Sequence, residues 1–183
     1  PPMGELQKGE QRAHITSTDW HQDKGVMQAS ADNTTIVTAW CAISNATLDN
    51  GCLQVLTGAK ELLPHCAQTQ VGIAASRLDE TKAVPLPIPA GGVIFFHPLT
   101  PHGSQTNRSD HMRWSFDLRY HVTGEESGRS IFPEFVARSQ ANPDNVLRDW
   151  RDWRMMWETA RAHLANKESL GLYRWPSDGP YCA

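Results

Sequence analysis

The chain has 183 residues, which is long enough for one domain with a substantial hydrophobic core. Its formal net charge of −3 and its pI near 6.2 argue against nucleic acid or an anionic membrane as the main partner. The longest apolar runs, such as residues 91–96, are far too short to span a bilayer. We therefore expect a cytoplasmic protein that acts on a small-molecule substrate, and the sequence leaves its oligomeric state open.

Residues 34–44 (TTIVTAWCAIS) are rich in β-branched side chains and predict a strand. Its two faces would carry alternate residues: Thr34, Ile36, Thr38, Trp40 and Ala42 on one, and Thr35, Val37, Ala39, Cys41 and Ile43 on the other. Cys41 in this apolar setting indicates a small buried side chain in a reducing compartment, and no cysteine spacing requires a disulfide or a zinc site. The Asp49-Asn50-Gly51 turn then leads into a second short strand at residues 52–56.

Residues 57–90 form a long connection that contains four prolines. Within it, residues 84–88 could add an edge strand, because Pro85 and Pro87 cannot donate hydrogen bonds to neighbouring strands. Residues 93–96 follow a Gly-Gly turn and are continuously apolar, which predicts a buried strand.

The last predicted strand, at residues 113–120 (RWSFDLRY), alternates between apolar and polar side chains. One face would carry Trp114, Phe116, Leu118 and Tyr120, and the other would carry Arg113, Ser115, Asp117 and Arg119. The polar face would meet either bulk water or a wet interior, and alternation alone does not distinguish the two.

The spacing of the apolar residues changes near the C-terminus, where it predicts a long helix over about residues 143–166. Asn142 suits the N-cap, Pro143 the first helical position and Asp144 the positive end of the helix dipole. The apolar residues that recur at helical spacing are Leu147, Trp150, Trp153, Trp157 and Leu164. This tryptophan stripe predicts an amphipathic helix laid against a sheet. Many short strands with Gly and Pro turns, plus this helix, indicate a mostly β sandwich or barrel with a supporting helix.

A candidate metal site begins with a histidine and an aspartate two residues apart. In an extended segment, His21 and Asp23 project from the same face. An imidazole, a carboxylate and a second histidine from a distant segment form the facial triad that holds Fe(II) and leaves positions open for other ligands. His102, in a rigid Pro101-His102-Gly103-Ser104 loop after a strand, could supply the second histidine. The His-x-Asp pair alone is a weak signal.

The sequence resembles the phytanoyl-CoA dioxygenase (PhyH-like) family of Fe(II)/2-oxoglutarate oxygenases over roughly residues 18–125. The matching stretches are WHQD (residues 20–23), TAWCAISNATLDNGCLQVLTGAK (38–60) and GGVIFFHPLTPHGSQTNRSDHMRWSFDLRY (91–120). The resemblance implies that His21, Asp23 and His102 are the metal ligands and catalytic centre. It also implies that Arg113 binds the distal carboxylate of 2-oxoglutarate with help from Ser104. A guanidinium suits that task because its rigid fork pairs with a carboxylate through two hydrogen bonds.

The resemblance further implies that Trp40 lines the co-substrate pocket and that Gln22, inside the His-x-Asp segment, belongs to the cofactor site. The implied fold is a double-stranded β-helix, a jelly-roll barrel of the cupin type. The implied enzyme uses Fe(II), 2-oxoglutarate and O₂ to hydroxylate or otherwise oxidise an unactivated C–H bond, and it releases succinate and CO₂. Its primary substrate is not implied.

Two features depart from the family pattern. Gly92 stands where the family usually has an aspartate, which should affect only the turn. Family members also carry a long segment ahead of the His-x-Asp pair, whereas this chain carries only twenty residues there. We therefore expect residues 1–183 to form a single dioxygenase domain that lacks the N-terminal part of the family domain.

Three alternatives stay open. His97 precedes His102 in the same loop and could face the metal instead. The same three ligands could activate water in a divalent-metal hydrolase, which would leave Arg113 without a purpose. A non-catalytic barrel homologue is the third. The remaining histidines stand in polar or loop settings and are expected to be solvated: His14, His65, His111, His121 and His163.

Overall fold

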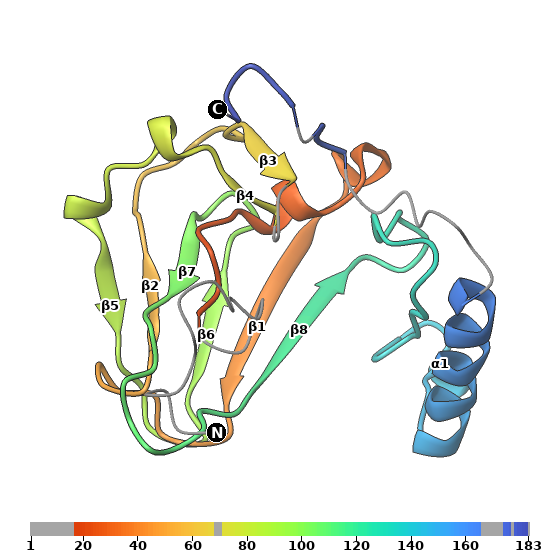
Figure 1. Cartoon of the computed structure of the whole chain (residues 1–183). Coiled ribbons are helices and arrows are strands. Elements are labelled where there is room, and N and C mark those ends of the chain that lie inside the picture. Colours follow the sequence, from red (N-terminus) through yellow and green to blue (C-terminus); the bar gives the residue numbers. More distant parts are fainter. Residues whose placement is uncertain (1–16, 68–70, 166–173, 177, 183) are drawn as a thin grey trace. The chain divides into compact units, whose positions relative to one another are not determined.

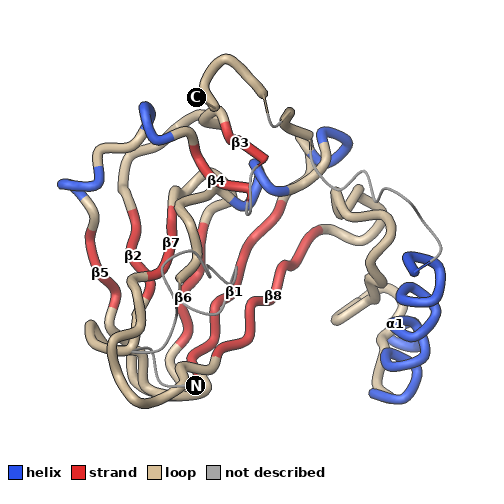
Figure 2. Tube along the Cα trace, in the orientation of Figure 1, coloured by secondary structure: helices blue, strands red, loops and turns tan. Residues whose placement is uncertain are grey.

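The computed structural model describes residues 17–67, 71–165, 174–176 and 178–182, and these residues are mostly β with one α-helix (Figures 1 and 2). They belong to two compact units. The first unit is formed by Pro1–Val26, Ile36–Tyr120 and Tyr173–Ala183, and the second by Met27–Thr35 and His121–Leu172.

The first unit contains the sheets. Its strands are β1 (Ile36–Ala42), β2 (Leu53–Val55), β3 (His65–Ala67), β4 (Val71–Ile73), β5 (Val84–Leu86), β6 (Val93–Phe96), β7 (His102–Ser104) and β8 (Ser115–His121). Three sheets result, with the strand orders β6-β1-β8, β5-β2-β7 and β3-β4 (Figure 1). β1 pairs with β6, β2 pairs with both β5 and β7, and β3 pairs with β4, all in antiparallel register.

The core lies between the two three-stranded sheets. Trp40 of β1 and Phe96 of β6 belong to the same buried cluster as Leu53 and Val55 of β2. Burial along β1 follows the predicted alternation in part: Ile36, Thr38, Trp40 and Ala42 are all buried on one face, but Ala39 on the other face is buried as well. Cys41 points to the other face and is only half-buried, so its expected burial was wrong.

The turn before β2 and the edge strand β5 follow the sequence expectations. Gly51 adopts a positive φ of 81°, and a Cβ atom there would lie 2.5 Å from the backbone oxygen of Gln105. Only glycine fits both conditions. β5 is at the edge of its sheet, where Pro85 lies opposite Gln54 of β2, so the predicted edge strand is confirmed.

Two sequence expectations about the other strands were wrong. Only Phe96 of β6 is buried, and Phe95 is 69% exposed. Val93 and Phe95 share one face of the strand and are exposed, whereas Ile94 and Phe96 on the other face are more buried, so the continuous apolar run does not mean cover on both faces. The stretch 57–90, expected as a connection, also contains the hairpin β3-β4, whose strands of three residues are too short for periodicity to reveal.

The second unit contains the α-helix, α1 (Trp150–Ala165), which begins later than predicted. Residues 143–145 form a separate 3-10 turn, and the Asn142 side chain makes no capping hydrogen bond. Residue 166, the expected end, lies outside the described residues. None of the described helices is both long and apolar enough to cross a bilayer.

The tryptophan stripe of α1 does not form a buried core, because no residue of α1 is buried. Its rings instead pack on the loop that precedes the helix in the same unit. The ring centroids of Trp157 and Phe132 are 5.6 Å apart, and those of Trp153 and Phe135 are 6.1 Å apart. The expected packing of this stripe on a sheet stays a prediction, because the helix and the sheets belong to different units.

Candidate metal centre

Two of the predicted metal ligands are joined through their backbones. His21 lies beside β7, where its N–H donates to the carbonyl of His102 and its carbonyl accepts the reciprocal bond from the His102 N–H, each at 2.9 Å. The two imidazole centroids are 4.2 Å apart. Asp23 follows as the first residue of a 3-10 turn, Asp23–Val26, and is fully buried. A single β-bridge and the turn beside it therefore bring the ligands together.

The side chains of His21, Asp23 and His102 form the one group of potential metal ligands found among the described residues, with ligand atoms within 4.8 Å of one another. The Nδ1 atom of His21 bonds to the carbonyl of Asp19 at 2.8 Å, and that of His102 bonds to the carbonyl of Thr100 at 2.9 Å. These bonds fix the rings and leave both Nε2 atoms facing the group. Such outer partners are typical of metal-binding histidines.

The protonation states also suit a metal. Burial, reinforced by nearby His102 and opposed by Asp23, lowers the pKa of His21 to about 3. Burial would raise the pKa of Asp23, but the charge of Arg119 and the neighbouring histidines outweigh it and lower this pKa to about 2. A neutral imidazole and an ionised carboxylate are the forms that bind a cation.

Two side chains hold the Asp23 carboxylate, and neither was singled out as a site residue from the sequence. The Thr38 hydroxyl donates to Oδ2, and Arg119 donates to Oδ1 through Nη2 and through Nε, the latter at 3.0 Å. Strand alternation could have found both, since Thr38 shares a face of β1 with Trp40, and the alternation predicted over residues 113–120 puts Arg119 on the same face as Arg113.

A small cavity of about 240 Å³ opens beside the metal ligands and is lined by His21, His102, Trp40 and Arg113, among others. The Arg113 guanidinium is half-buried, stacks over the Trp40 ring at 5.1 Å and donates to the Ser115 hydroxyl at 3.2 Å. Burial lowers its pKa. The described part of the chain places no carboxylate within ion-pair distance of it. Arg113 is therefore positioned to receive an anionic group from a ligand.

The other two predicted contacts, Gln22 and Ser104, are placed away from this cavity. The Gln22 side chain is fully buried, where its amide donates to the carbonyls of Glu61 and Leu99 and accepts the N–H of Leu63. The Ser104 hydroxyl accepts the N–H of Thr18 at 2.7 Å. Gln22 thus ties loops together behind the ligands.

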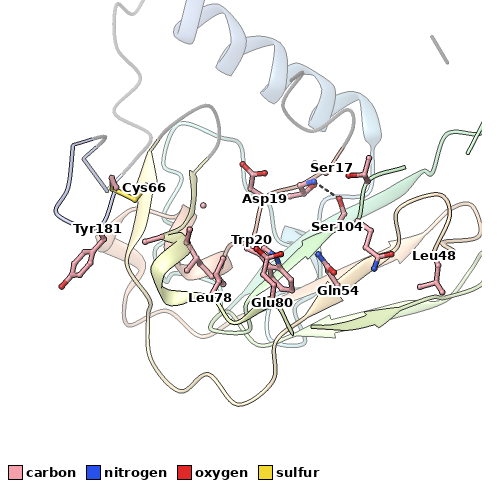
Figure 3. Close-up of a pocket in the computed structure, with 18 of the residues that line it drawn as sticks. Ser17, Asp19, Trp20, Leu48, Gln54, Cys66, Leu78, Glu80, Ser104 and Tyr181 are labelled. Atoms are coloured by element: carbon pink, nitrogen blue, oxygen red, sulfur yellow. Dashed lines mark hydrogen bonds between the residues drawn. A yellow bond between two sulfur atoms is a disulfide. The ribbon is translucent and has the colours of Figure 1, made fainter. Parts of the chain in front are cut away.

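Ser104 lines a second, larger cavity of about 900 Å³, in which Figure 3 also shows Gln54, Glu80 and Tyr181. Thr18 borders both cavities. The alternative ligand His97 is exposed and stands outside the ligand group, and its Nδ1 accepts the N–H of Leu99.

His65 was expected to be solvated, and that expectation was wrong. It is 1% exposed on β3, and burial lowers its pKa to about 4. Its Nε2 accepts the N–H of Gln22 at 3.0 Å, so its Nδ1 carries the proton that bonds to the carbonyl of Leu63. A neutral histidine therefore supports the peptide between the two ligands of the His-x-Asp segment. His14 lies outside the described residues.

Comparison with known proteins gives the family. Residues 8–115 match the family model described as phytanoyl-CoA dioxygenase (PhyH). The chain belongs to the phytanoyl-CoA dioxygenase family. The peroxisomal phytanoyl-CoA dioxygenase of Bos taurus is 36% identical to it, over 83% of this chain and 48% of the bovine protein. A probable phytanoyl-CoA dioxygenase of Caenorhabditis elegans is 32% identical, over 66% of this chain and 46% of that protein. The chain thus spans about half the length of these PhyH relatives.

The chain is also similar to solved structures. EvdO2 from Micromonospora carbonacea var. aurantiaca, solved as a complex with 2-oxoglutarate, is 26% identical with a TM-score of 0.50, over 61% of this chain and 50% of EvdO2. The non-heme monooxygenase ThoJ has a TM-score of 0.57 at 21% identity, over 83% of this chain and 63% of ThoJ, and supports the fold alone.

Proposed function

We propose that this PhyH-family protein is a non-haem Fe(II)- and 2-oxoglutarate-dependent dioxygenase, an oxidoreductase that hydroxylates or otherwise oxidises an unactivated C–H bond of a small organic substrate. The observation that carries the proposal is that His21 and His102, clustered with Asp23, open onto the same small cavity as Arg113. Two imidazoles and one carboxylate are the donor set of non-haem Fe(II) oxygenases. When bound, Fe(II) supplies the O₂ chemistry that converts 2-oxoglutarate to succinate and CO₂.

The chain's own residues have separate tasks in this proposal. His21, Asp23 and His102 hold the metal, and Arg113 pairs with the distal carboxylate of 2-oxoglutarate. Trp40 keeps the guanidinium in place by stacking on it. The small cavity has a volume of about 240 Å³, whereas pockets for drug-sized ligands measure roughly 300 Å³ or more. Its size therefore suits a small diacid.

The co-substrate roles of Ser104 and Gln22 stay predictions. Ser104 keeps a hydroxyl hydrogen to donate while it accepts from Thr18, but it is not among the residues that line the small cavity with Arg113. Gln22 acts on the site through the loops that its amide joins.

The finer architecture and setting belong to the same proposal. Two antiparallel three-stranded sheets with a shared core suit a double-stranded β-helix, and a single dioxygenase domain would include both compact units. The mildly acidic charge favours a small-molecule substrate over nucleic acid or a membrane surface. The cytoplasmic location expected from the sequence stays a prediction.

The test is O₂-dependent succinate formation by the purified chain with Fe(II), 2-oxoglutarate and a panel of small organic substrates. Succinate should form slowly without substrate and faster with a good one. A protein that binds metal but forms no succinate under any of these conditions contradicts the proposal. Ester or amide hydrolysis in the absence of O₂ would instead support the hydrolase alternative, and failure to bind a divalent metal would support the non-catalytic one.

A further inference from the structure

The C-terminal segment of the first unit packs directly on the metal-binding turn. The Trp175 indole N–H donates to the carbonyl of Gly25 at 2.7 Å, and Gly25 is the third residue of the turn that Asp23 begins. The same indole stacks on the His65 imidazole, with ring centroids 5.4 Å apart and planes inclined by 22°. Trp175 therefore touches both the turn and the histidine beneath it.

His65 links Trp175 to the peptide between His21 and Asp23. Its Nε2 accepts the N–H of Gln22, which stands between His21 and Asp23. The ring lies so close to the turn that a Cβ atom at Gly25 would approach it to 2.2 Å. A shift of the imidazole would therefore displace the turn, because the two are in direct contact.

A disulfide fastens the C-terminal segment in this position. Cys66, the residue after His65, is bonded to Cys182, and Arg77 stacks over the Tyr181 ring at 5.0 Å. Among the described residues, the other contacts that hold this segment include the Trp175 hydrogen bond and stack and the Arg77–Tyr181 stack, each worth about 1 kcal/mol. Ordering the segment costs roughly 1–2 kcal/mol per residue in backbone entropy, so the covalent bond adds a restraint that weak contacts of this size do not replace.

We propose that the Cys66–Cys182 disulfide is a redox latch that keeps Trp175 as a positioning residue for the metal-binding turn. Opening the latch frees the C-terminal segment, loosens the turn and weakens metal binding. The inference rests on the proposed function, and it adds that the redox state of the disulfide regulates metal binding. Trp175 and Cys182 both lie outside residues 8–115, which match the PhyH family model, so the latch is a feature of this chain beyond the matched region.

The chemistry requires a dithiol reductant. It donates two electrons and two protons, the S–S bond breaks to give two thiols, and the reductant closes to its own disulfide. Both cysteines line the large cavity of about 900 Å³, where Figure 3 shows Cys66 with its disulfide at the wall. A small dithiol can therefore approach the bond from that cavity. In a reducing compartment the latch would stand open and would close under oxidising conditions.

The experiment compares the oxidised and dithiothreitol-reduced full chain by titration with Co(II), followed by its visible absorption. Loss of an outer partner typically lowers metal affinity by roughly 10–100-fold, so we expect reduction to weaken Co(II) binding by about 10-fold. Cys182→Ser should bind as weakly as the reduced protein and ignore the reductant. Cys41→Ser, which removes an unpaired cysteine on the opposite face of β1 from Trp40, should respond like the wild type.

Two substitutions of Trp175 separate positioning from general stability. Trp175→Phe keeps a stacked ring without the N–H donor and should lose part of the affinity, whereas Trp175→Leu should lose as much as reduction does. Hydrogen exchange of the amides at residues 20–26 should accelerate in every variant that loses affinity.

Three results would overturn the latch: four free thiols in the oxidised protein, Co(II) affinity unchanged after mass spectrometry shows an open disulfide, or exchange at residues 20–26 unaffected by reduction. If the oxidised wild type binds no Co(II), the proposed function fails. The exchange measurement then decides the latch by itself.

Discussion

The two cavities of the first unit differ in how the polar side chains that line them are arranged. The larger one, of about 900 Å³, is lined by scattered polar groups such as Gln54, Asp49 and Arg108. The smaller one, of about 240 Å³, gathers two histidines whose Nε2 atoms face a buried carboxylate and an arginine without a carboxylate partner in the described chain. Convergence of buried, mutually oriented polar groups identifies the candidate site, and volume does not.

The largest expected difference between the two cavities comes from removing one carboxylate near each of them. Asp23→Ala should weaken Co(II) binding by more than roughly 100-fold and abolish succinate formation, because a direct ligand is worth more than an outer partner. Asp49→Ala, at the larger cavity, should leave both unchanged. Calorimetric titration and the succinate assay measure the pair, and equal behaviour of the two variants would remove the distinction.

The two arginines provide the next contrast. Arg113→Ala should weaken 2-oxoglutarate binding to the Co(II)-loaded protein by roughly 10–100-fold, since hydrogen bonds to a charged group contribute about 1.5–3 kcal/mol. Arg113→Lys should recover part of this loss, because it keeps the charge without the fork. Arg108→Ala is the matched control, and a similar loss there would mean that the diacid does not select the smaller cavity.

Two glutamines sharpen the comparison at the level of stability. Gln22→Leu should lower the free energy of unfolding by roughly 3 kcal/mol, because it removes three hydrogen bonds of about 1 kcal/mol each, to the backbone groups of Glu61, Leu63 and Leu99. Gln54→Leu, at the larger cavity, should change it by less than about 0.5 kcal/mol. Urea unfolding of both variants gives the values, and a cost below 1 kcal/mol for Gln22→Leu would contradict its role as a tie.

The smallest expected effect concerns pH. The pKa of His65 is lowered from 6.5 to about 4, so between these pH values the unfolded chain binds a proton that the folded chain does not. Stability should therefore fall as the pH falls through this window, by roughly 2 kcal/mol at pH 4.5. Without metal, the wild type should lose that much more than His65→Gln between pH 7 and 4.5 in urea unfolding. Equal losses would show that His65 does not titrate as a buried neutral group.

Sequence patterns predicted several strands and which residues share a face, but they did not predict which face is buried. The alternation of residues 113–120 assigned Arg113 and Arg119 to one face, but only their contacts with the distant Trp40 and Asp23 show that this face looks inward. The burial of His65 depends on packing against Gly25 and Trp175, residues far from it in sequence. No pattern within one segment contains such information.

The same limit explains the helix boundary and the two cofactor contacts. A good N-cap sequence at Asn142 did not start α1, because local propensity is weak beside the packing of the chain around it. The family resemblance placed Gln22 and Ser104 near the site. The direction of each side chain depends instead on the backbone groups to which it hydrogen-bonds, and these groups lie far away in the sequence.

The reciprocal bridge between His21 and His102 has a consequence for how the protein matures. It joins segments far apart in the sequence, so forming it closes a long loop. A nascent or misfolded chain would therefore present these two histidines apart from one another. The proposed metal site would then be assembled only in a chain that has already reached its native topology.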